Sequence, residues 1–258
     1  MEADAAPLDE PVDDDSPIAD AAADSEGLRR ARRRSLALAV GLLLLAAALA
    51  ASLRSNVLDP WFQPFDDAVR SWSIDHRSGF ATDLAKLLSV IGSSWVSFPV
   101  RLGVTVLLVV QRKWTQLAAF IVAIAASEVA IGTLKDFIDR PRPPASLVVT
   151  TGMSFPSGHA IAGAVTAFGI VAALLPRGRR RWHWFVVAST FAALMSWSRV
   201  YLSAHWATDT IAGTAIGVGL ALLTEGLFEG GRTTVATTVV PEDDVSTASL
   251  SEGGAARP

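Results

Sequence analysis

The 258-residue sequence contains no cysteine, and it is poor in histidine and in charge. Without cysteine, disulfide bonds, thiolate catalysis and cysteine-based zinc or iron–sulfur sites are all excluded. Only four histidines (His76, His159, His183 and His205) are available, which severely limits any other metal site. Charged residues make up 18% of the chain, against roughly 25% in ordinary globular proteins. The chemistry must therefore come from a small set of polar side chains.

Apolar residues make up 51% of the chain and are gathered into long runs. A helical run of about 20 such residues crosses the roughly 30 Å hydrocarbon core of a membrane. We therefore expect an all-α polytopic membrane protein with six transmembrane helices. The expected spans are residues 36–53, 89–110, 115–134, 160–176, 185–201 and 208–226.

Basic residues occur in alternate connections between these spans. They precede the first span at Arg29–Arg34, join the second to the third at Arg112 and Lys113, and join the fourth to the fifth at Arg177–Arg181. The positive-inside rule places these segments, and with them both termini, in the cytoplasm. The connections 54–88, 135–159 and 202–207 then face the extracytoplasmic side of the cell membrane.

Both ends of the chain have the composition of disordered segments. Residues 1–28 contain ten acidic residues and no basic one, and the segment after Gly230 is rich in threonine, serine and acidic residues. Such segments cannot bury a core. We therefore divide the chain into a disordered acidic and then arginine-rich cytoplasmic tail (1–34), a six-helix transmembrane domain (35–226) and a disordered cytoplasmic tail (227–258).

The 54–88 connection has the pattern of a short helix lying in the outer membrane interface. Phe65, Val69 and Trp72 follow one another at helical spacing, while Asp66 and its polar neighbours occupy the other face. Such a helix places its apolar face in the membrane and its polar face toward water.

Two charged residues lie deep inside the expected spans, away from the span ends. Arg101 lies near the middle of the second span and Glu128 in the outer half of the third. Charges at this depth are costly and usually pair or line a polar cavity. We expect Glu128 to pair with Arg101, or to hold Lys135 in position. In the alternative, Arg101 extends toward the membrane surface and the second span is shifted.

An arginine, a histidine and an aspartate lie close together near the start of the last span, at Arg199, His205 and Asp209. In a helix, residues four apart share a face, so Asp209 could accept the proton of one imidazole nitrogen. The other nitrogen would keep a lone pair and act as a base, a ligand or a nucleophile. A helix-end histidine with a salt bridge is the simpler interpretation of this segment alone.

Two upstream segments on the same side favour anion binding. Lys135, Arg140 and Arg142 precede a proline-rich loop, where the positive-inside bias disfavours cations unless they bind an anion or lipid headgroups. Ser157 and Gly158 stand at the start of an apolar helix, whose free N–H groups attract anions. His159 follows at once, placed to exchange a proton.

Together the three segments offer the groups that phosphoryl transfer requires. Three cations, Lys135, Arg142 and Arg199, can neutralise the phosphoryl oxygens, and two histidines fit the in-line path of attack and departure. No cluster of acidic residues for a two-metal site is apparent on this side. We therefore expect no metal, no cofactor and no nucleic-acid partner.

The three segments also resemble a known signature. Lys135 through Arg142-Pro143, then Pro156 through His159, then Ser198-Arg199 through His205 and Asp209 are similar, in order and spacing, to the type-2 phosphatidic acid phosphatase superfamily. That family also includes the vanadium-dependent haloperoxidases. The resemblance covers about residues 85–226 and departs from the pattern at no signature position.

The resemblance implies a role for each matching residue. His205 would attack phosphorus and become a phosphohistidine, Asp209 would orient it, and His159 would protonate the leaving group and then activate water. The phosphoryl oxygens would be held by five groups: Lys135, Arg142, Ser157, the Gly158 amide and Arg199. Arg140 matches no signature position and is a candidate for contacting a second phosphate. The family works without a metal.

The expected function is hydrolysis of a lipid-linked phosphate monoester or diphosphate at the outer leaflet of the plasma membrane. Candidate substrates are a polyprenyl diphosphate, phosphatidic acid and phosphatidylglycerol phosphate. A composition typical of high-GC bacteria favours recycling of a polyprenyl wall carrier. The alternatives are a phosphotransferase that uses the same phosphohistidine, a haloperoxidase, whose known members are soluble, and a non-catalytic lipid-binding or transport protein.

Overall fold

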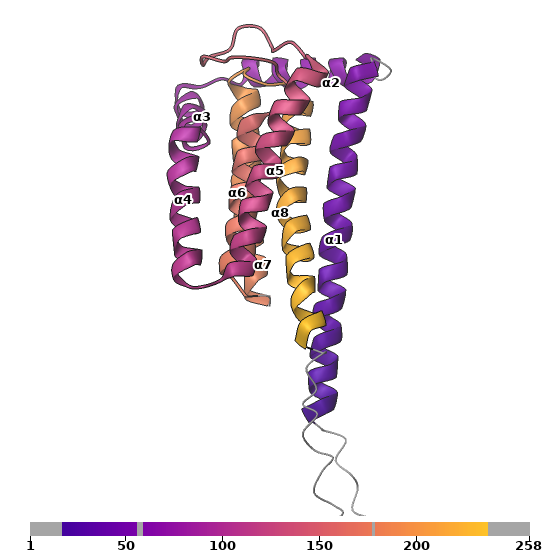
Figure 1. Cartoon of the computed structure of the whole chain (residues 1–258). Helices are drawn as coiled ribbons and strands as arrows, with labels where there is room; N and C mark the ends of the chain where they lie inside the picture. The colour runs from indigo at the N-terminus through magenta and orange to yellow at the C-terminus, as the bar shows by residue number, and fades with distance from the viewer. Residues whose placement is uncertain (1–16, 56–58, 177–178, 237–258) are drawn as a thin grey trace, which may run out of the picture.

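The computed structural model describes residues 17–55, 59–176 and 179–236, and within these ranges the chain forms eight helices and no strand. The helices are α1 (Pro17–Ser55), α2 (Asp59–Asp75), α3 (Gly79–Ile91), α4 (Ser94–Val110), α5 (Trp114–Ile138), α6 (Gly158–Leu174), α7 (Arg179–Tyr201) and α8 (Ala207–Ala236). Most of them run side by side in one bundle, while α2 lies across one end (Figure 1). The prediction of an all-α fold is confirmed.

Helices α6 and α8 together form the centre of the bundle: α6 contacts α4, α5, α7 and α8, and α8 also contacts α1 and α2. Small residues let α6 and α8 approach closely. A Cβ atom at Gly217 of α8 would lie 2.6 Å from the Ile161 carbonyl oxygen, and one at Gly213 would lie 2.8 Å from the Ser157 carbonyl oxygen. Small residues at such contacts bring membrane helices together. The Gly213 contact places the start of α8 against the start of α6.

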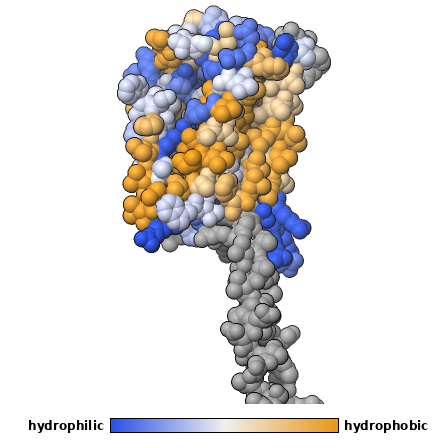
Figure 2. Space-filling model, viewed as in Figure 1, coloured by the Kyte–Doolittle hydropathy of each residue, from blue (hydrophilic) through white to orange (hydrophobic). Residues whose placement is uncertain are grey.

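Among the described residues, length and composition identify three helices as candidate membrane spans: Ser25–Ser55 of α1, all of α5, and Ala207–Phe228 of α8. Helices α3 and α4 together form a fourth candidate, bent by 49° at their break. Helix α6 is apolar but has only 17 residues, about 26 Å at 1.5 Å per residue. An apolar band crosses the visible face of the bundle (Figure 2). The number of six transmembrane helices therefore stays a prediction.

Several predicted boundaries were wrong. Helix α1 begins at Pro17 and α8 ends at Ala236, so residues 17–34 and 227–236 are helical rather than disordered. In α1, alanines and a Glu26–Arg30 ion pair at i, i+4 favour the helix. The remaining parts of both predicted tails, 1–16 and 237–258, lie outside the described residues.

The 54–88 connection holds two helices rather than one, and the predicted span 89–110 is broken at Gly92 and Ser93. Helix α3 begins after Ser78, whose side chain accepts a hydrogen bond from the Ala81 N–H. A Cβ atom at Gly92 would lie 2.6 Å from the Met195 sulfur, so glycine allows the chain to bend against α7. Helix α5 continues to Ile138 and therefore includes Lys135, which was expected in the loop.

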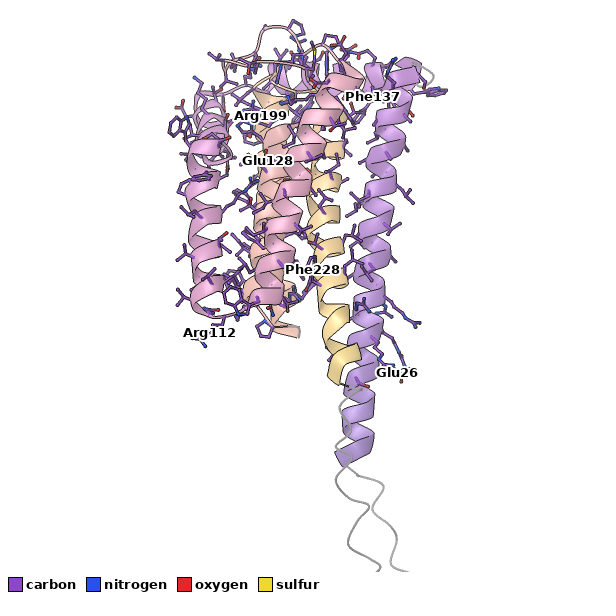
Figure 3. All side chains as sticks on the ribbon, viewed as in Figure 1. Glu26, Arg112, Glu128, Phe137, Arg199 and Phe228 are labelled. Carbon is purple, nitrogen blue, oxygen red and sulfur yellow. The ribbon has the colours of Figure 1, made fainter. Side chains whose placement is uncertain are left out.

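The candidate catalytic segments meet at one end of the bundle. The α5–α6 connection, the α7–α8 turn and α2 all lie there, and this end is strongly polar (Figures 1 and 2). The basic α4–α5 turn with Arg112 lies at the opposite end (Figure 3), where α1 begins and α8 ends. This arrangement agrees with the predicted alternation of sides, although which end faces the cytoplasm stays a prediction.

The α6–α8 contact gives a testable expectation. Gly217→Ala should lower the melting temperature in detergent, because overpacking a tight contact costs about 1–3 kcal/mol. Gly132→Ala in α5 is the matched control, since a Cβ atom there meets nothing within 4 Å. It should leave the melting temperature unchanged or raise it slightly. Equal melting temperatures for the two variants would contradict the close packing.

Candidate active site

His205 lies in the turn before α8 and is almost fully buried. Its Nδ1 atom is 2.7 Å from the Ser154 carbonyl oxygen. A carbonyl oxygen can only accept, so Nδ1 carries the proton in this contact. The other nitrogen, Nε2, is 3.2 Å from Nη1 of Arg142, which can only donate. These two contacts select the neutral imidazole with a lone pair on Nε2.

Asp209 lies beside this histidine, but not in the way the sequence suggested. His205 is outside α8, so the two residues do not share a helical face, and the Asp209 Oδ2 atom is 3.7 Å from Nδ1. Oδ2 instead accepts hydrogen bonds from the Ser154 hydroxyl and, at 2.9 Å, from the Trp206 N–H. The last contact is a cap at the start of α8. The carboxylate therefore supports the imidazole electrostatically, while the Ser154 carbonyl oxygen accepts the hydrogen bond from Nδ1.

The surroundings of His205 keep it uncharged. Burial lowers its pKa to about 4; the Asp209 carboxylate opposes this shift, while the charges of Arg142 and Arg199 add to it. An ordinary histidine has a pKa of about 6.5. At neutral pH the imidazole is therefore free to use its lone pair.

His159 and Arg199 meet at a residue that the sequence analysis did not identify. The Nε2 atom of His159 lies 3.2 Å from the Ser89 carbonyl oxygen, and Arg199 donates a hydrogen bond to the Ser89 hydroxyl. Ser89 belongs to α3, near the bend that leads into α4. Because a carbonyl only accepts, the Nε2 atom of His159 carries a proton and Nδ1 remains for exchange.

Lys135 and Arg142 point into the α5–α6 loop and are held by backbone carbonyls. Lys135 Nζ donates to the Met153 oxygen at 2.8 Å, and Arg142 donates to the Gly152 oxygen at 2.8 Å and the Ala204 oxygen at 2.7 Å. Burial lowers the pKa of Arg142, and Asp209 opposes the shift. Carbonyl dipoles solvate these cations without neutralising them.

Ser157 and Gly158 begin α6, as predicted. The Ser157 side chain is the N-cap and accepts from the Ala160 N–H at 3.5 Å, a long contact. The Ser157 N–H donates to the Asp209 carbonyl oxygen at 3.1 Å, which ties α6 to α8 beside His205. At Gly158, a Cβ atom would meet only Ile131, at 3.9 Å, so the protein itself leaves this position open.

Arg140 is the one supporting residue whose suggested role was wrong. Its side chain is buried and forms 2.7 Å contacts with Asp66 and with Asp209. Although burial acts to lower it, the pKa of Arg140 is raised by Asp209 and Asp66. A guanidinium held between two carboxylates is not available for a second phosphate.

The predicted pair of Arg101 and Glu128 is confirmed, at 2.8 Å between Nη1 and Oε1. Arg101 also donates to the Thr166 hydroxyl at 2.9 Å, so the pair joins α4, α5 and α6. Figure 3 shows Glu128 on the side of α5 that faces α4. The alternative role for Glu128, holding Lys135, is not observed, because Lys135 contacts the Met153 carbonyl.

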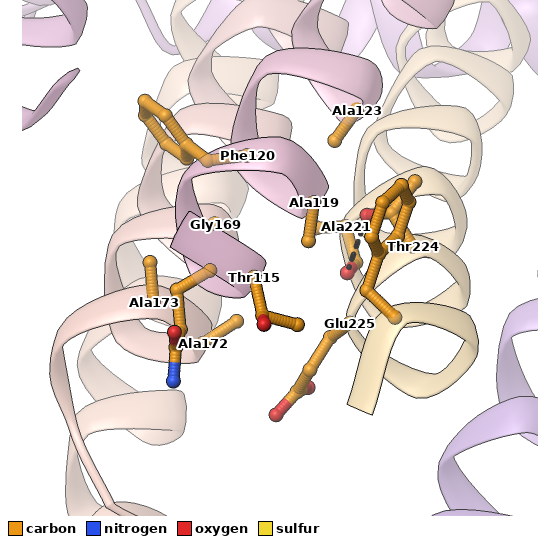
Figure 4. A pocket seen from close by; sticks show the side chains of 12 residues that line it. Thr115, Ala119, Phe120, Ala123, Gly169, Ala172, Ala173, Ala221, Thr224 and Glu225 are labelled. Carbon is orange, nitrogen blue, oxygen red and sulfur yellow. Dashed lines mark hydrogen bonds between the residues drawn. The ribbon is translucent and has the colours of Figure 1, made fainter. Parts of the chain in front are cut away.

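A cavity of about 640 Å³ lies between α4, α5 and α6. It extends from His159 and Gly158 past Ala162 and Ser97 to Arg101 and Glu128. Figure 4 shows a second pocket, between α5, α6 and α8, at the opposite end of α5. That pocket holds only about 20 Å³, room for about one water molecule. The large cavity reaches the candidate catalytic residues through His159 and Gly158, whereas none of them lines the small pocket.

Sequence reasoning found the charged residues of the site but missed their partners. Ser89, Ser154 and Thr208 are ordinary polar residues with no spacing signal in the sequence. Asp66 was assigned to the water-facing side of an interfacial helix, but it is 1% exposed. Its helical spacing with Ser73, which is also buried, was the available signal.

The state of His205 can be measured directly. In histidine-labelled protein in detergent, the His205 NMR signal, assigned with His205→Gln, should titrate with a midpoint near pH 4. Because the unfolded chain binds this proton at higher pH, the shift should also reduce stability as the pH falls from about 6.5 toward 4. A midpoint at or above 6.5 would contradict the buried neutral imidazole.

Two known proteins are similar to this chain in sequence. The chain is 27% identical to phosphatidylglycerophosphatase B of Bacillus subtilis over 195 residues, which cover 74% of this chain and 94% of that protein. It is 31% identical to an undecaprenyl-diphosphatase of Sulfolobus acidocaldarius over 155 residues, which cover 54% of this chain and 67% of that protein.

Solved structures give the same fold. A transmembrane PAP2-type phosphatidylglycerolphosphate phosphatase from Bacillus subtilis matches with a TM-score of 0.63 and 26% identity, over 76% of this chain and 96% of that one. Aquifex aeolicus LpxE matches in fold with a TM-score of 0.51 and 22% identity, over 61% and 92% of the two chains. The sequence model of the PAP2 superfamily matches residues 116–229, which contain every signature residue described above. This chain is a membrane protein and belongs to the PAP2 superfamily.

Proposed function

We propose that this membrane lipid phosphatase hydrolyses a phosphate monoester or diphosphate through a phosphohistidine at His205, without a metal ion. The observation that carries the proposal is the hydrogen bonding of the imidazole. Nδ1 is tied to the Ser154 carbonyl, and Nε2 keeps its lone pair beside Arg142. A neutral buried imidazole next to a cation is suited to attack an anionic phosphoryl group.

In the first step, Nε2 of His205 forms a bond to phosphorus as the bond from phosphorus to the leaving oxygen breaks. His159 gives that oxygen a proton. The imidazolium that develops at His205 is stabilised by Asp209, whose Oδ2 atom is 3.7 Å from Nδ1. A bound phosphoryl group offsets the positive charge of Arg199 and Arg142 around His159, which favours its protonated form.

In the second step, water attacks phosphorus and the bond between nitrogen and phosphorus breaks. His159, now neutral, takes the proton from the water. Throughout both steps Lys135, Arg142 and Arg199 surround the equatorial oxygens, and the start of α6 adds the Ser157 hydroxyl and backbone N–H groups. These groups supply positive charge where most phosphoryl-transfer enzymes use magnesium.

The substrate class follows from the cavity and the relatives. The cavity of about 640 Å³ joins His159 to the apolar faces of α4, α5 and α6, which suits a lipid whose chain remains in the bilayer. The two curated relatives are named for a phosphatidylglycerol phosphate and an undecaprenyl diphosphate. We propose these two lipids and phosphatidic acid as candidate substrates, acted on at the extracytoplasmic face of the plasma membrane.

The first experiment is phosphate release from these three lipids by purified protein in detergent with excess EDTA. Wild type should release phosphate, and His205→Ala should lower kcat at least about 1,000-fold because the nucleophile is gone. His183→Ala is the matched control, since His183 is exposed and lies near the start of α7, far from the site. It should retain full activity.

Each other result identifies an alternative. Activity lost with EDTA and restored by a divalent ion would contradict the metal-free mechanism. Release by His205→Ala at the wild-type rate would contradict the phosphohistidine. A folded wild type that binds the lipids without releasing phosphate would favour the binding or transport function, and phosphate transfer to an added alcohol instead of water would favour a phosphotransferase.

The cavity gives a second expectation. Ser97→Trp places a large ring in the cavity, so it should lower kcat/KM about tenfold or more for long-chain lipids while a short, water-soluble phosphate ester is hydrolysed normally. Ala193→Trp is the control, because Ala193 lines a different groove, between α1, α7 and α8. Equal effects of Ser97→Trp on long and short substrates would show that the lipid chain does not use this cavity.

A further inference from the structure

We propose that Asp66 of α2 is a positioning residue for catalysis, acting through Arg140 on the Asp209 carboxylate. The inference rests on the proposed phosphohistidine at His205, which Asp209 supports. It gives α2 a part in the active site, although α2 lies outside residues 116–229, the region that matches the PAP2 superfamily.

Two ion pairs of 2.7 Å and one contact of 3.7 Å lead from α2 to the histidine. Nη2 of Arg140 is 2.7 Å from Oδ2 of Asp66, and Nη1 of Arg140 is 2.7 Å from Oδ1 of Asp209. Oδ2 of Asp209 then faces Nδ1 of His205. The two aspartate side chains are 0% exposed and the arginine is 8% exposed. In such a dry environment these charged contacts are strong and resist rearrangement.

Arg140 determines which oxygen of Asp209 faces the imidazole. It occupies Oδ1, while Oδ2 accepts from the Ser154 hydroxyl and the Trp206 N–H. The carboxylate therefore cannot rotate without breaking contacts on both oxygens. Without the arginine contact, Asp209 would be held through Oδ2 alone, and the carboxylate could rotate about its contacts with Ser154 and Trp206.

Asp66 also holds the beginning of α8. Its Oδ1 atom accepts from the Thr208 N–H at 2.9 Å, and its Oδ2 atom accepts from the Thr208 hydroxyl at 2.6 Å. Free N–H groups in the first turn of a helix attract an anion. Asp66 supplies that anion from another helix. Because Thr208 directly precedes Asp209, these contacts also position the backbone that carries Asp209.

The charges of the cluster point to the same role. Asp66, Arg140 and Asp209 carry a formal net charge of −1, and this excess stabilises positive charge on His205 during attack. If Asp66 were neutral, the positive charge of Arg140 would be balanced by Asp209 alone. The cluster would then carry no net negative charge, and the negative potential at the imidazole would weaken. The Arg140 guanidinium also lies over the Trp206 ring, 5.5 Å from its centre.

The test compares Asp66→Asn with Asp67→Asn. Asp67 is the next residue of α2, is exposed, and accepts a hydrogen bond from Gln63. We expect Asp66→Asn to lower kcat by about 10- to 100-fold, the range that small misplacements of catalytic groups produce. KM should change little, because the three cations that bind phosphate are untouched. Asp67→Asn should behave as wild type.

Two inhibitors separate positioning from general loss of structure. Orthovanadate forms a bond with the attacking nitrogen and resembles the transition state, whereas inorganic phosphate occupies the site without it. In Asp66→Asn the inhibition constant of vanadate should rise about as much as kcat falls, and that of phosphate should stay near the wild-type value. If Asp66 has a purely structural role, the variant should bind both inhibitors equally more weakly, or bind both as wild type does once the amount of folded protein is taken into account. Either result would overturn the proposal.

Arg140→Lys is the second variant, because a lysine keeps the charge but cannot bridge both carboxylates. It should show the same lowered kcat and selective loss of vanadate inhibition. If neither variant yields folded protein while Asp67→Asn does, the cluster serves stability and the proposal is wrong. His205→Ala serves as the reference: if it still releases phosphate, the proposed function fails, whatever Asp66→Asn shows.

Discussion

The hydrogen bond from Nδ1 of His205 to the Ser154 carbonyl is the contact on which the site depends. Since a carbonyl cannot donate, this bond determines the tautomer and leaves the lone pair on Nε2. Burial keeps water away and makes the charged imidazolium costly at rest. In the proposed reaction the same burial strengthens the interaction with Asp209 once positive charge develops. Neutrality at rest and stabilisation during attack thus have one physical origin.

Four buried or half-buried arginines of the described chain differ in the kind of partner they have. Arg140 and Arg181 contact carboxylates, of Asp66 and Asp209 and of Glu225 respectively, so their charge is balanced locally. Arg142 contacts carbonyl oxygens, and Arg199 contacts a hydroxyl. Neutral partners orient and solvate a cation but leave its field intact. The positive charge of Arg142 and Arg199 therefore remains available where the proposed phosphate binds, which a count of basic residues in the sequence cannot show.

The sequence predicted the parts of this structure that depend on local pattern. Apolar runs gave the helices, and the spacing of Lys135, Arg142, His159, Arg199 and His205 gave the cationic, histidine-containing end. The ion pair of Arg101 and Glu128 was also expected, because charges in apolar helices need partners. The helix ends were less predictable: α1 and α8 extend into polar segments, and the α3–α4 bend depends on Met195 of a distant helix. Ser89 and Ser154 could not be found, since their contribution lies partly in backbone carbonyls that any residue has.

Helix α2 shows why amphipathic pattern alone assigned Asp66 to the wrong environment. Two of the three residues predicted for its apolar face, Phe65 and Trp72, are exposed, as expected for side chains that meet a membrane interface. At the surface of a soluble protein, the opposite face would meet water. Here that face meets the polar end of a helix bundle, where Arg140 and the start of α8 require an anion. A carboxylate that looked solvated is therefore buried, because in a membrane protein the polar face of an interfacial helix can be its inner face.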